Sequence, residues 1–114
     1  MIPQKVLIID DEEDLCHLMK SFFVPLGYEV QAAYTLSDGL DLVQSMLPDI
    51  IFIDNNLPDG LGWEKVDYIR SVVPACQITL ISAYKTVSER MLSNNIPILE
   101  KPISLSILRN YLPA

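Results

Sequence analysis

Basic residues are scarce in this chain of 114 residues. It contains eight Lys and Arg against fifteen Asp and Glu, which gives a formal net charge of −7. Nucleic-acid surfaces need clustered Lys and Arg to neutralise phosphates, so this balance argues against nucleic-acid binding. An acidic chain of this kind is typical of a soluble protein that binds cations or basic partner surfaces.

Long apolar runs and cysteine clusters are also missing. No run approaches the roughly 18–20 apolar residues that span a bilayer. The opening segment MIPQKVLIIDDEED lacks the basic start and apolar stretch of a signal peptide. Cys16 and Cys76 lie far apart without a CxxC motif or a Cys/His cluster, which favours two buried free thiols over a disulfide. We therefore expect a cytoplasmic protein that does not bind membranes.

Short apolar runs alternate with amphipathic segments along the chain. The apolar runs predict five strands, at 5–9, 28–34, 50–53, 77–82 and 96–100. Apolar residues at helical spacing predict helices at 12–24, 36–47, 63–73 and 105–112, and a weak, short helix at 84–95. This alternation indicates right-handed crossovers and a parallel sheet covered on both faces. The sequence predicts one doubly wound α/β domain over residues 1–114.

Polar side chains follow four of the five predicted strands. They are Asp10 and Asp11 after the first strand, Asp54 after the third, Ser82 at the end of the fourth and Lys101 after the fifth. Ligands bind outside the carboxyl ends of strands in open α/β sheets, so we expect these groups to share one crevice. Each has an ordinary alternative, in a helix cap, a turn or the surface. Their coincidence at one edge favours a functional site.

Three carboxylates in one crevice cannot all stay ionised unless a pKa rises or a cation binds. Oxygen ligands with room for water suit Mg²⁺, and Asp10 and Asp11 are predicted to hold it. Lys101 adds positive charge and Ser82 adds a hydroxyl donor. Together these groups would neutralise a phosphoryl group while Asp54 attacks phosphorus, which predicts Asp54 as a nucleophile.

The residues that carry this pattern resemble a known family, the receiver domains of bacterial two-component response regulators. The resemblance covers essentially the full chain, through VLIIDDEED, PDIIFIDNNLPDGLG, LISAY and LEKP. It implies a flavodoxin-like fold whose five parallel strands, counted along the chain, have the order 2-1-3-4-5. It also implies a phosphorylation-switched signalling domain, which is not an enzyme acting on a separate metabolite.

The resemblance assigns roles to the acidic residues. Asp54 would accept a phosphoryl group from a phosphohistidine on a sensor histidine kinase or a histidine phosphotransfer protein. Mg²⁺ would be bound by Asp11 and Asp54, by Asp10 through water, and by the backbone carbonyl of Asn56. The output partner or domain is not specified by the sequence.

The resemblance also implies roles for the residues at the last two strand ends. Ser82 and Lys101 would bind the aspartyl phosphate, and the Lys101–Pro102 peptide would be cis, as X-Pro bonds permit. Asn56 and Tyr84 lie two positions beyond Asp54 and Ser82, where they are predicted to tune the lifetime of the phosphoryl group. Turn formation and surface packing are the ordinary alternatives for both.

Three features depart from the family pattern. Ile98 stands where the family usually has Tyr or Phe, whose rotation couples phosphorylation to the output face. The segment between Ser82 and Lys101 is shorter than the family pattern, which predicts a shortened fourth helix. No output domain follows in these residues, so the domain either acts alone or belongs to a longer chain.

Leu15, Pro102 and Ile103 are predicted to form an apolar patch beside the acidic cleft, where a kinase helix would dock. Core packing is the alternative for Leu15. A pseudo-receiver, which binds partners without phosphorylation, is a second hypothesis that Ile98 and the short fourth helix favour. A metal-dependent phosphatase is a third hypothesis, and Asn56 argues against it because a general acid would be needed at that position.

Overall fold

The structure of the chain, a computed structural model, describes residues 4–83 and 96–111. Five parallel strands form one sheet in the order β2-β1-β3-β6-β7. They are β1 (Lys5–Ile9), β2 (Glu29–Ala33), β3 (Ile50–Asp54), β6 (Gln77–Ser82) and β7 (Ile98–Glu100). Counted among the parallel strands alone, this is the order 2-1-3-4-5, so the predicted doubly wound fold is confirmed.

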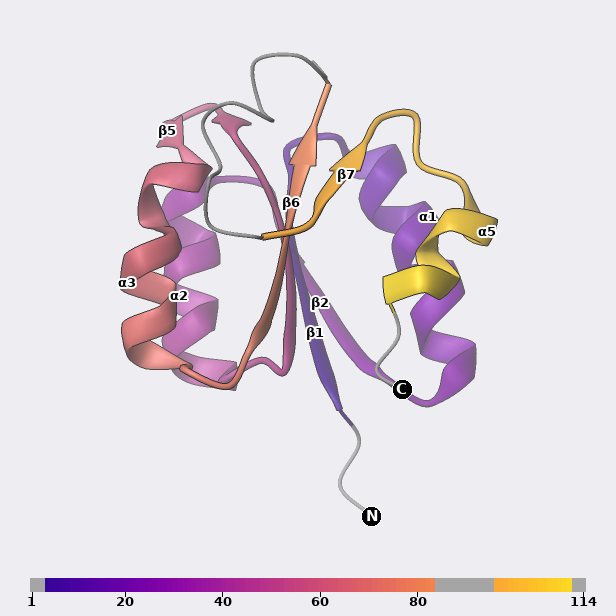
Figure 1. Cartoon of the computed structure of the whole chain (residues 1–114), viewed down its shortest axis with the longest axis horizontal. Coiled ribbons are helices and arrows are strands. Elements are labelled where there is room, and N and C mark those ends of the chain that lie inside the picture. Colours follow the sequence, from indigo (N-terminus) through magenta and orange to yellow (C-terminus); the bar gives the residue numbers. More distant parts are fainter. Residues whose placement is uncertain (1–3, 84–95, 112–114) are drawn as a thin grey trace.

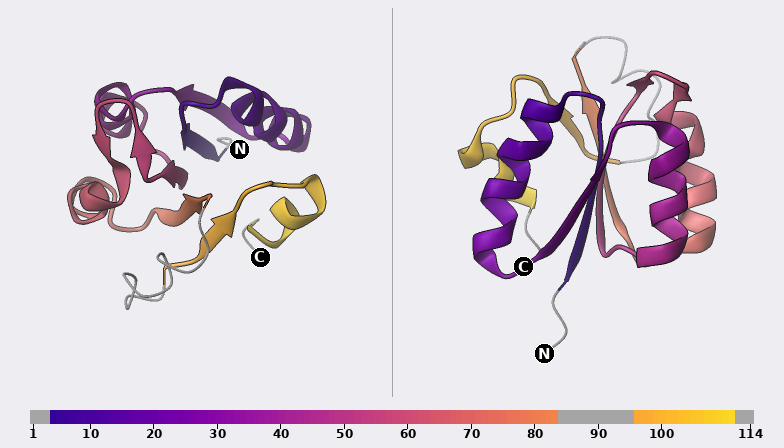
Figure 2. Two further views of the ribbon diagram at one scale, coloured as in Figure 1. Left: turned by 90° about the horizontal axis from the view of Figure 1, so that it is seen from above. Right: turned by 180° about the vertical axis from the view of Figure 1, so that it is seen from behind.

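Helices cover both faces of the sheet (Figure 1). One face carries α1 (Glu13–Phe23) and α5 (Leu105–Leu108), and the other carries α2 (Leu36–Met46) and α3 (Val66–Val72). Figure 2 shows the same two layers from above and from behind. Short 3₁₀ segments follow α1, precede α3 and follow α5, at Val24–Leu26, Gly62–Lys65 and Arg109–Tyr111.

The predicted helices agree with the observed ones to within a few residues. The helix predicted at 63–73 begins as a 3₁₀ segment, and the one predicted at 105–112 is a single α-helical turn with a 3₁₀ continuation. The helix predicted at 84–95, and with it the shortened fourth helix, lies outside the described residues.

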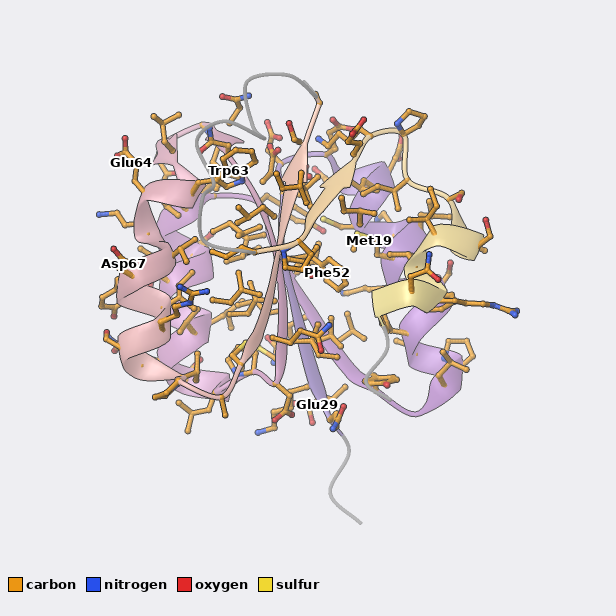
Figure 3. The ribbon with its side chains drawn as sticks, viewed as in Figure 1. Met19, Glu29, Phe52, Trp63, Glu64 and Asp67 are labelled. Atoms are coloured by element: carbon orange, nitrogen blue, oxygen red, sulfur yellow. The ribbon has the colours of Figure 1, made fainter. Side chains whose placement is uncertain are left out.

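The core consists of two apolar clusters, one on each face of the sheet. Successive side chains of a strand point to opposite faces, so β3 supplies both clusters. Ile51 and Ile53 pack with α2 and α3, whereas Ile50 and Phe52 pack with α1 and α5. Figure 3 shows Phe52 and Met19 between the sheet and α1. Every residue of β3 is buried, as the unbroken apolar run predicts for a central parallel strand.

A short hairpin follows β3 and contacts the start of α2. Its strands are β4 (Asn56–Leu57) and β5 (Gly60–Leu61), which pair antiparallel. Asp59, at the turn, accepts hydrogen bonds from the backbone N–H groups of Leu36 and Ser37 at 2.7 and 2.9 Å. These bonds lower the pKa of Asp59. The hairpin therefore ties the segment after Asp54 to the start of α2.

The two thiols are free, as predicted. Cys16 is buried and Cys76 is half-buried, so the prediction that both are buried holds fully for Cys16 alone. Burial raises the pKa of each thiol to about 12, which keeps both protonated at neutral pH. Among the helices that the structure describes, none is long and apolar enough to cross a bilayer.

Candidate functional site

Asp10, Asp11 and Asp54 meet at the carboxyl edge of the sheet, as the sequence predicts. One carboxylate oxygen of each lies within 4.8 Å of the others. Asp54 is the last residue of β3, and Asp10 directly follows β1, the strand that pairs with β3. The parallel register of these two strands therefore places the carboxylates side by side. Asp10 and Asp54 are buried, and Asp11 is exposed to solvent.

Both buried carboxyl groups have raised pKa values, and burial is the main cause. Burial and, to a smaller extent, the Asp10 carboxylate raise the pKa of Asp54 to about 6, and Lys101 opposes this rise. Burial also raises the pKa of Asp10, although the backbone N–H of Glu12 donates to its Oδ1 at 2.8 Å. A set of carboxylate oxygens this close is a hard donor set, and a divalent cation would stabilise its ionised form.

Lys101 follows β7 and reaches the same edge. Its Nζ lies 3.3 Å from Asp10 Oδ2 and 2.6 Å from Glu12 Oε1. Among the described residues, Asp10 Oδ2 has no aligned hydrogen-bond donor, so its contact with Lys101 is an ion pair alone. The backbone N–H of Lys101 donates to the carbonyl of Ser82 at 2.9 Å, which joins the ends of β6 and β7. The Lys101–Pro102 peptide is cis, as predicted.

Ser82 and Asn56 lie at the same end of the sheet in different surroundings. Ser82 is the last residue of β6 and is buried, paired in register with Glu100 of β7. Asn56 is the first residue of β4 and is exposed. The sequence prediction that four strand ends gather their polar residues at one edge is therefore confirmed.

The segment after Asp54 folds back closely on β3. The backbone N–H of Gly62 donates to the carbonyl of Asn55 at 2.9 Å. A Cβ atom at Gly62 would lie 2.2 Å from the backbone oxygen of Asp54, so only glycine fits there without a backbone shift. The half-buried Trp63 donates from its indole Nε1 to the carbonyl of Ile53 at 3.3 Å (Figure 3). These contacts hold the end of β3 in place.

The remaining predicted residues have varied surroundings. Ile98 is half-buried and packs against the core cluster on the α2–α3 face. Leu15 and Ile103 are buried in the cluster on the α1–α5 face, in line with core packing for Leu15, whereas Pro102 is exposed. Their docking role stays a prediction. Tyr84 lies outside the described residues.

Sequence reasoning missed two residues of this region. Glu12 forms the shorter of the two ion pairs with Lys101, and Asp59 caps α2 from the hairpin. Both contacts join residues far apart in the chain. The run of acids after Asp11 was the available signal for Glu12, and the Pro-Asp-Gly sequence at 58–60, whose first two residues form the loop, was the signal for the hairpin.

A doubly wound sheet with charged groups collected at its carboxyl edge defines a class of α/β domains that bind ligands at the strand ends. Within this class, the family model described as "Response regulator receiver domain" matches residues 6–112. The chain belongs to the response regulator receiver domain family. The resemblance inferred from its four motifs is therefore confirmed, and the family is one of signalling domains in two-component systems.

Individual relatives agree with this assignment. The chain is 30% identical over 112 residues to the response regulator protein PilR of Pseudomonas aeruginosa, and spans about a quarter of the length of that protein. It is 30% identical to a two-component response regulator from Clostridium difficile, with a TM-score of 0.85 over 95% of this chain and 91% of that one. A receiver domain protein from Methanospirillum hungatei has the same fold at 23% identity, with a TM-score of 0.86 over 96% and 90% of the two chains.

Proposed function

We propose that residues 1–114 form a single receiver domain that accepts a phosphoryl group on Asp54 with Mg²⁺ and thereby switches the binding of an output partner. The donor would be a phosphohistidine on a sensor histidine kinase or a histidine phosphotransfer protein. The observation that carries the proposal is the placement of Asp54, a buried carboxylate at the end of the central strand beside two further carboxylates and a lysine. The free thiols fit the reducing cytoplasm in which this exchange would occur.

The acidic residues fit the metal that the family implies. Asp10, Asp11 and Asp54 supply hard oxygen ligands, the buried Asp10 Oδ2 lacks an aligned donor among the described residues, and the pKa of Asp54 is raised. The backbone carbonyl of Asn56 would complete the protein's ligand set. When bound, Mg²⁺ supplies the positive charge that keeps these carboxylates ionised and neutralises phosphoryl oxygens.

The transfer itself is a displacement at phosphorus. A carboxylate oxygen of Asp54 attacks; the new O–P bond forms as the P–N bond to the donor histidine breaks. The leaving nitrogen keeps the electron pair and takes a proton from solvent. Lys101 would offset the charge on the phosphoryl oxygens, and Ser82 would donate a hydrogen bond to one of them. The rigid end of β3 keeps the attacking oxygen in position.

The test is to incubate the protein with Mg²⁺ and acetyl phosphate and to measure its intact mass. We expect the mass of one phosphoryl group to be added, and Asp54→Asn to abolish the addition because the attacking oxygen is lost. Asp67→Asn is the matched control, since Asp67 is an exposed aspartate on α3 (Figure 3). The proposal fails if the wild-type chain gains no mass or if Asp54→Asn gains as much as the wild type.

A pseudo-receiver that binds partners without phosphorylation is the second candidate function. The half-buried Ile98 favours it, because the family aromatic that couples phosphorylation to output is replaced there. Absence of both phosphoryl uptake and a response to beryllofluoride in the presence of Mg²⁺ would favour this function. The intact set of carboxylates and Lys101 supports the phosphoacceptor instead.

Asn56 is expected to govern the loss of the phosphoryl group more than its gain. Its exposed side chain lies two residues beyond Asp54, where it can orient an attacking water. Asn56→Leu should slow dephosphorylation about tenfold, roughly 1.4 kcal/mol of barrier, and change phosphorylation by acetyl phosphate less than about twofold. Both rates can be followed by intact-mass measurements. Equal changes in the two rates would contradict this role.

A further inference from the structure

The side chain of Glu12 is directed to Lys101 and away from the helix that it precedes. Glu12 is the N-cap residue of α1, and within the described residues its side chain makes no capping hydrogen bond. Its Oε1 instead lies 2.6 Å from Lys101 Nζ, closer than the 3.3 Å between that nitrogen and Asp10 Oδ2. The carboxylate of Glu12 therefore contacts the lysine more closely than the metal-binding candidate does.

The backbone on both sides of this contact is anchored. The N–H of Glu12 donates to Asp10 Oδ1 at 2.8 Å, and the N–H of Lys101 donates to the carbonyl of Ser82 at 2.9 Å. The Lys101 side chain is 16% exposed, whereas that of Glu12 is 58% exposed. The lysine side chain is therefore mostly covered, and Glu12 is the more exposed partner of the ion pair.

We propose that Glu12 is a positioning residue that occupies the ammonium group of Lys101 in the unmodified domain and is displaced when Asp54 carries a phosphoryl group. Glu12 thereby sets the affinity of the site for phosphoryl oxygens. This inference rests on the proposed function, because it concerns the state of Lys101 before the phosphoryl group arrives. Glu12 does not take part in the chemical step and acts through Lys101.

Glu12 is expected to weaken anion binding at the site in two ways. Its carboxylate competes with the phosphoryl oxygens for Lys101, and its negative charge repels the incoming anion. An ion pair with one exposed partner contributes little free energy. Loss of Glu12 should therefore raise the affinity for the anion by only about threefold. Salt screens exposed charges, so the change should shrink as ionic strength increases.

The experiment compares Glu12→Gln with Glu13→Gln. Glu13 is the next residue of the chain and is likewise exposed, and within residues 4–83 and 96–111 the ion pairs of Lys101 are with Asp10 and Glu12. Each variant is titrated with beryllofluoride at saturating Mg²⁺, and separately with Mg²⁺ alone, by Trp63 fluorescence. We expect Glu12→Gln to bind beryllofluoride about threefold more tightly than the wild type, and Glu13→Gln to stay close to the wild type. Melting temperatures verify that both variants are folded.

A double-mutant cycle isolates the contact. In a Lys101→Ala background, Glu12→Gln should no longer change beryllofluoride affinity more than Glu13→Gln does, because the competed group is gone. Equal effects of the two glutamine variants in the wild-type background would reduce the role of Glu12 to net charge and overturn the proposal. Weaker binding of Mg²⁺ and of beryllofluoride by Glu12→Gln would overturn it as well, since Glu12 would then support the metal.

The outcomes separate this inference from the proposed function. If the wild type binds beryllofluoride and Glu12→Gln binds it equally, the role of Glu12 is wrong and the phosphoacceptor role stands. If the wild type neither responds to beryllofluoride nor gains a phosphoryl group from acetyl phosphate, both are wrong.

Discussion

Asp54→Asn is expected to stabilise the metal-free protein by up to about 3 kcal/mol at pH 8. Burial raises the pKa of Asp54 from 3.8 to about 6. A carboxyl group whose pKa is higher in the folded state favours folding fully below pH 4, and this contribution is lost as the pH rises through 6. The wild type therefore holds an unfavourable buried charge at pH 8, and asparagine removes it.

Urea denaturation in the presence of a chelator measures this effect. At pH 3 the free energies of unfolding of the wild type and Asp54→Asn should nearly converge, since pH 3 lies below the ordinary pKa of 3.8 and the aspartate is then mostly protonated in both states. Mg²⁺ should reduce or reverse the difference at pH 8, because it stabilises the ionised wild type. Asp67→Asn, on the exposed face of α3, controls for the loss of one negative charge. A wild type as stable as Asp54→Asn at pH 8 without metal would contradict the prediction.

Gly62→Ala is expected to cost about 3 kcal/mol of folding stability, at the upper end of the range for overpacking. The added Cβ would lie 2.2 Å from the backbone oxygen of Asp54 and 2.9 Å from Ile53 Cγ1. A backbone oxygen cannot rotate away as the end of a side chain can, so the end of β3 must shift. Affinity for Mg²⁺ should fall with stability, because the shifted residue carries a carboxylate of the site.

Gly27→Ala is the matched control for this substitution. Gly27 has φ of +95°, and in the described part of the chain no atom beyond its two chain neighbours lies within 4 Å of a Cβ at that position, so alanine there meets backbone strain without a clash. This strain is worth about 1 kcal/mol. Urea denaturation should rank Gly62→Ala well below Gly27→Ala in stability. A loss at Gly62 no larger than at Gly27 would show that the hairpin adjusts to the extra methyl group.

The strands, and the edge of the sheet at which the site lies, could be predicted because they depend on local sequence and topology. A central parallel strand is buried on both faces and is therefore continuously apolar, as in β3. Once the strands alternate with helices, right-handed crossovers bring their carboxyl ends to one edge. The positions of Asp10, Asp54 and Lys101 then follow without any knowledge of side-chain contacts.

The contacts that were missed depend on side-chain geometry between distant segments. The ion pair of Glu12 with Lys101 joins residues 89 positions apart. Asp59 reaches Leu36 across 23 positions. Turn composition around Asp59 predicts a reversal of the chain but not which helix end the carboxylate contacts. Such contacts depend on how side chains from distant segments pack in the folded chain, which the local sequence does not determine.

The attachment of Asp59 to α2 has a consequence for hydrogen exchange. The first N–H groups of a helix have no acceptor within the helix, and here those of Leu36 and Ser37 bond to Asp59. Their exchange with solvent therefore depends on the contact with the hairpin as well as on the first turn of α2. Two amides on a neighbouring helix thus report opening of the hairpin that follows Asp54, without any label in the site itself.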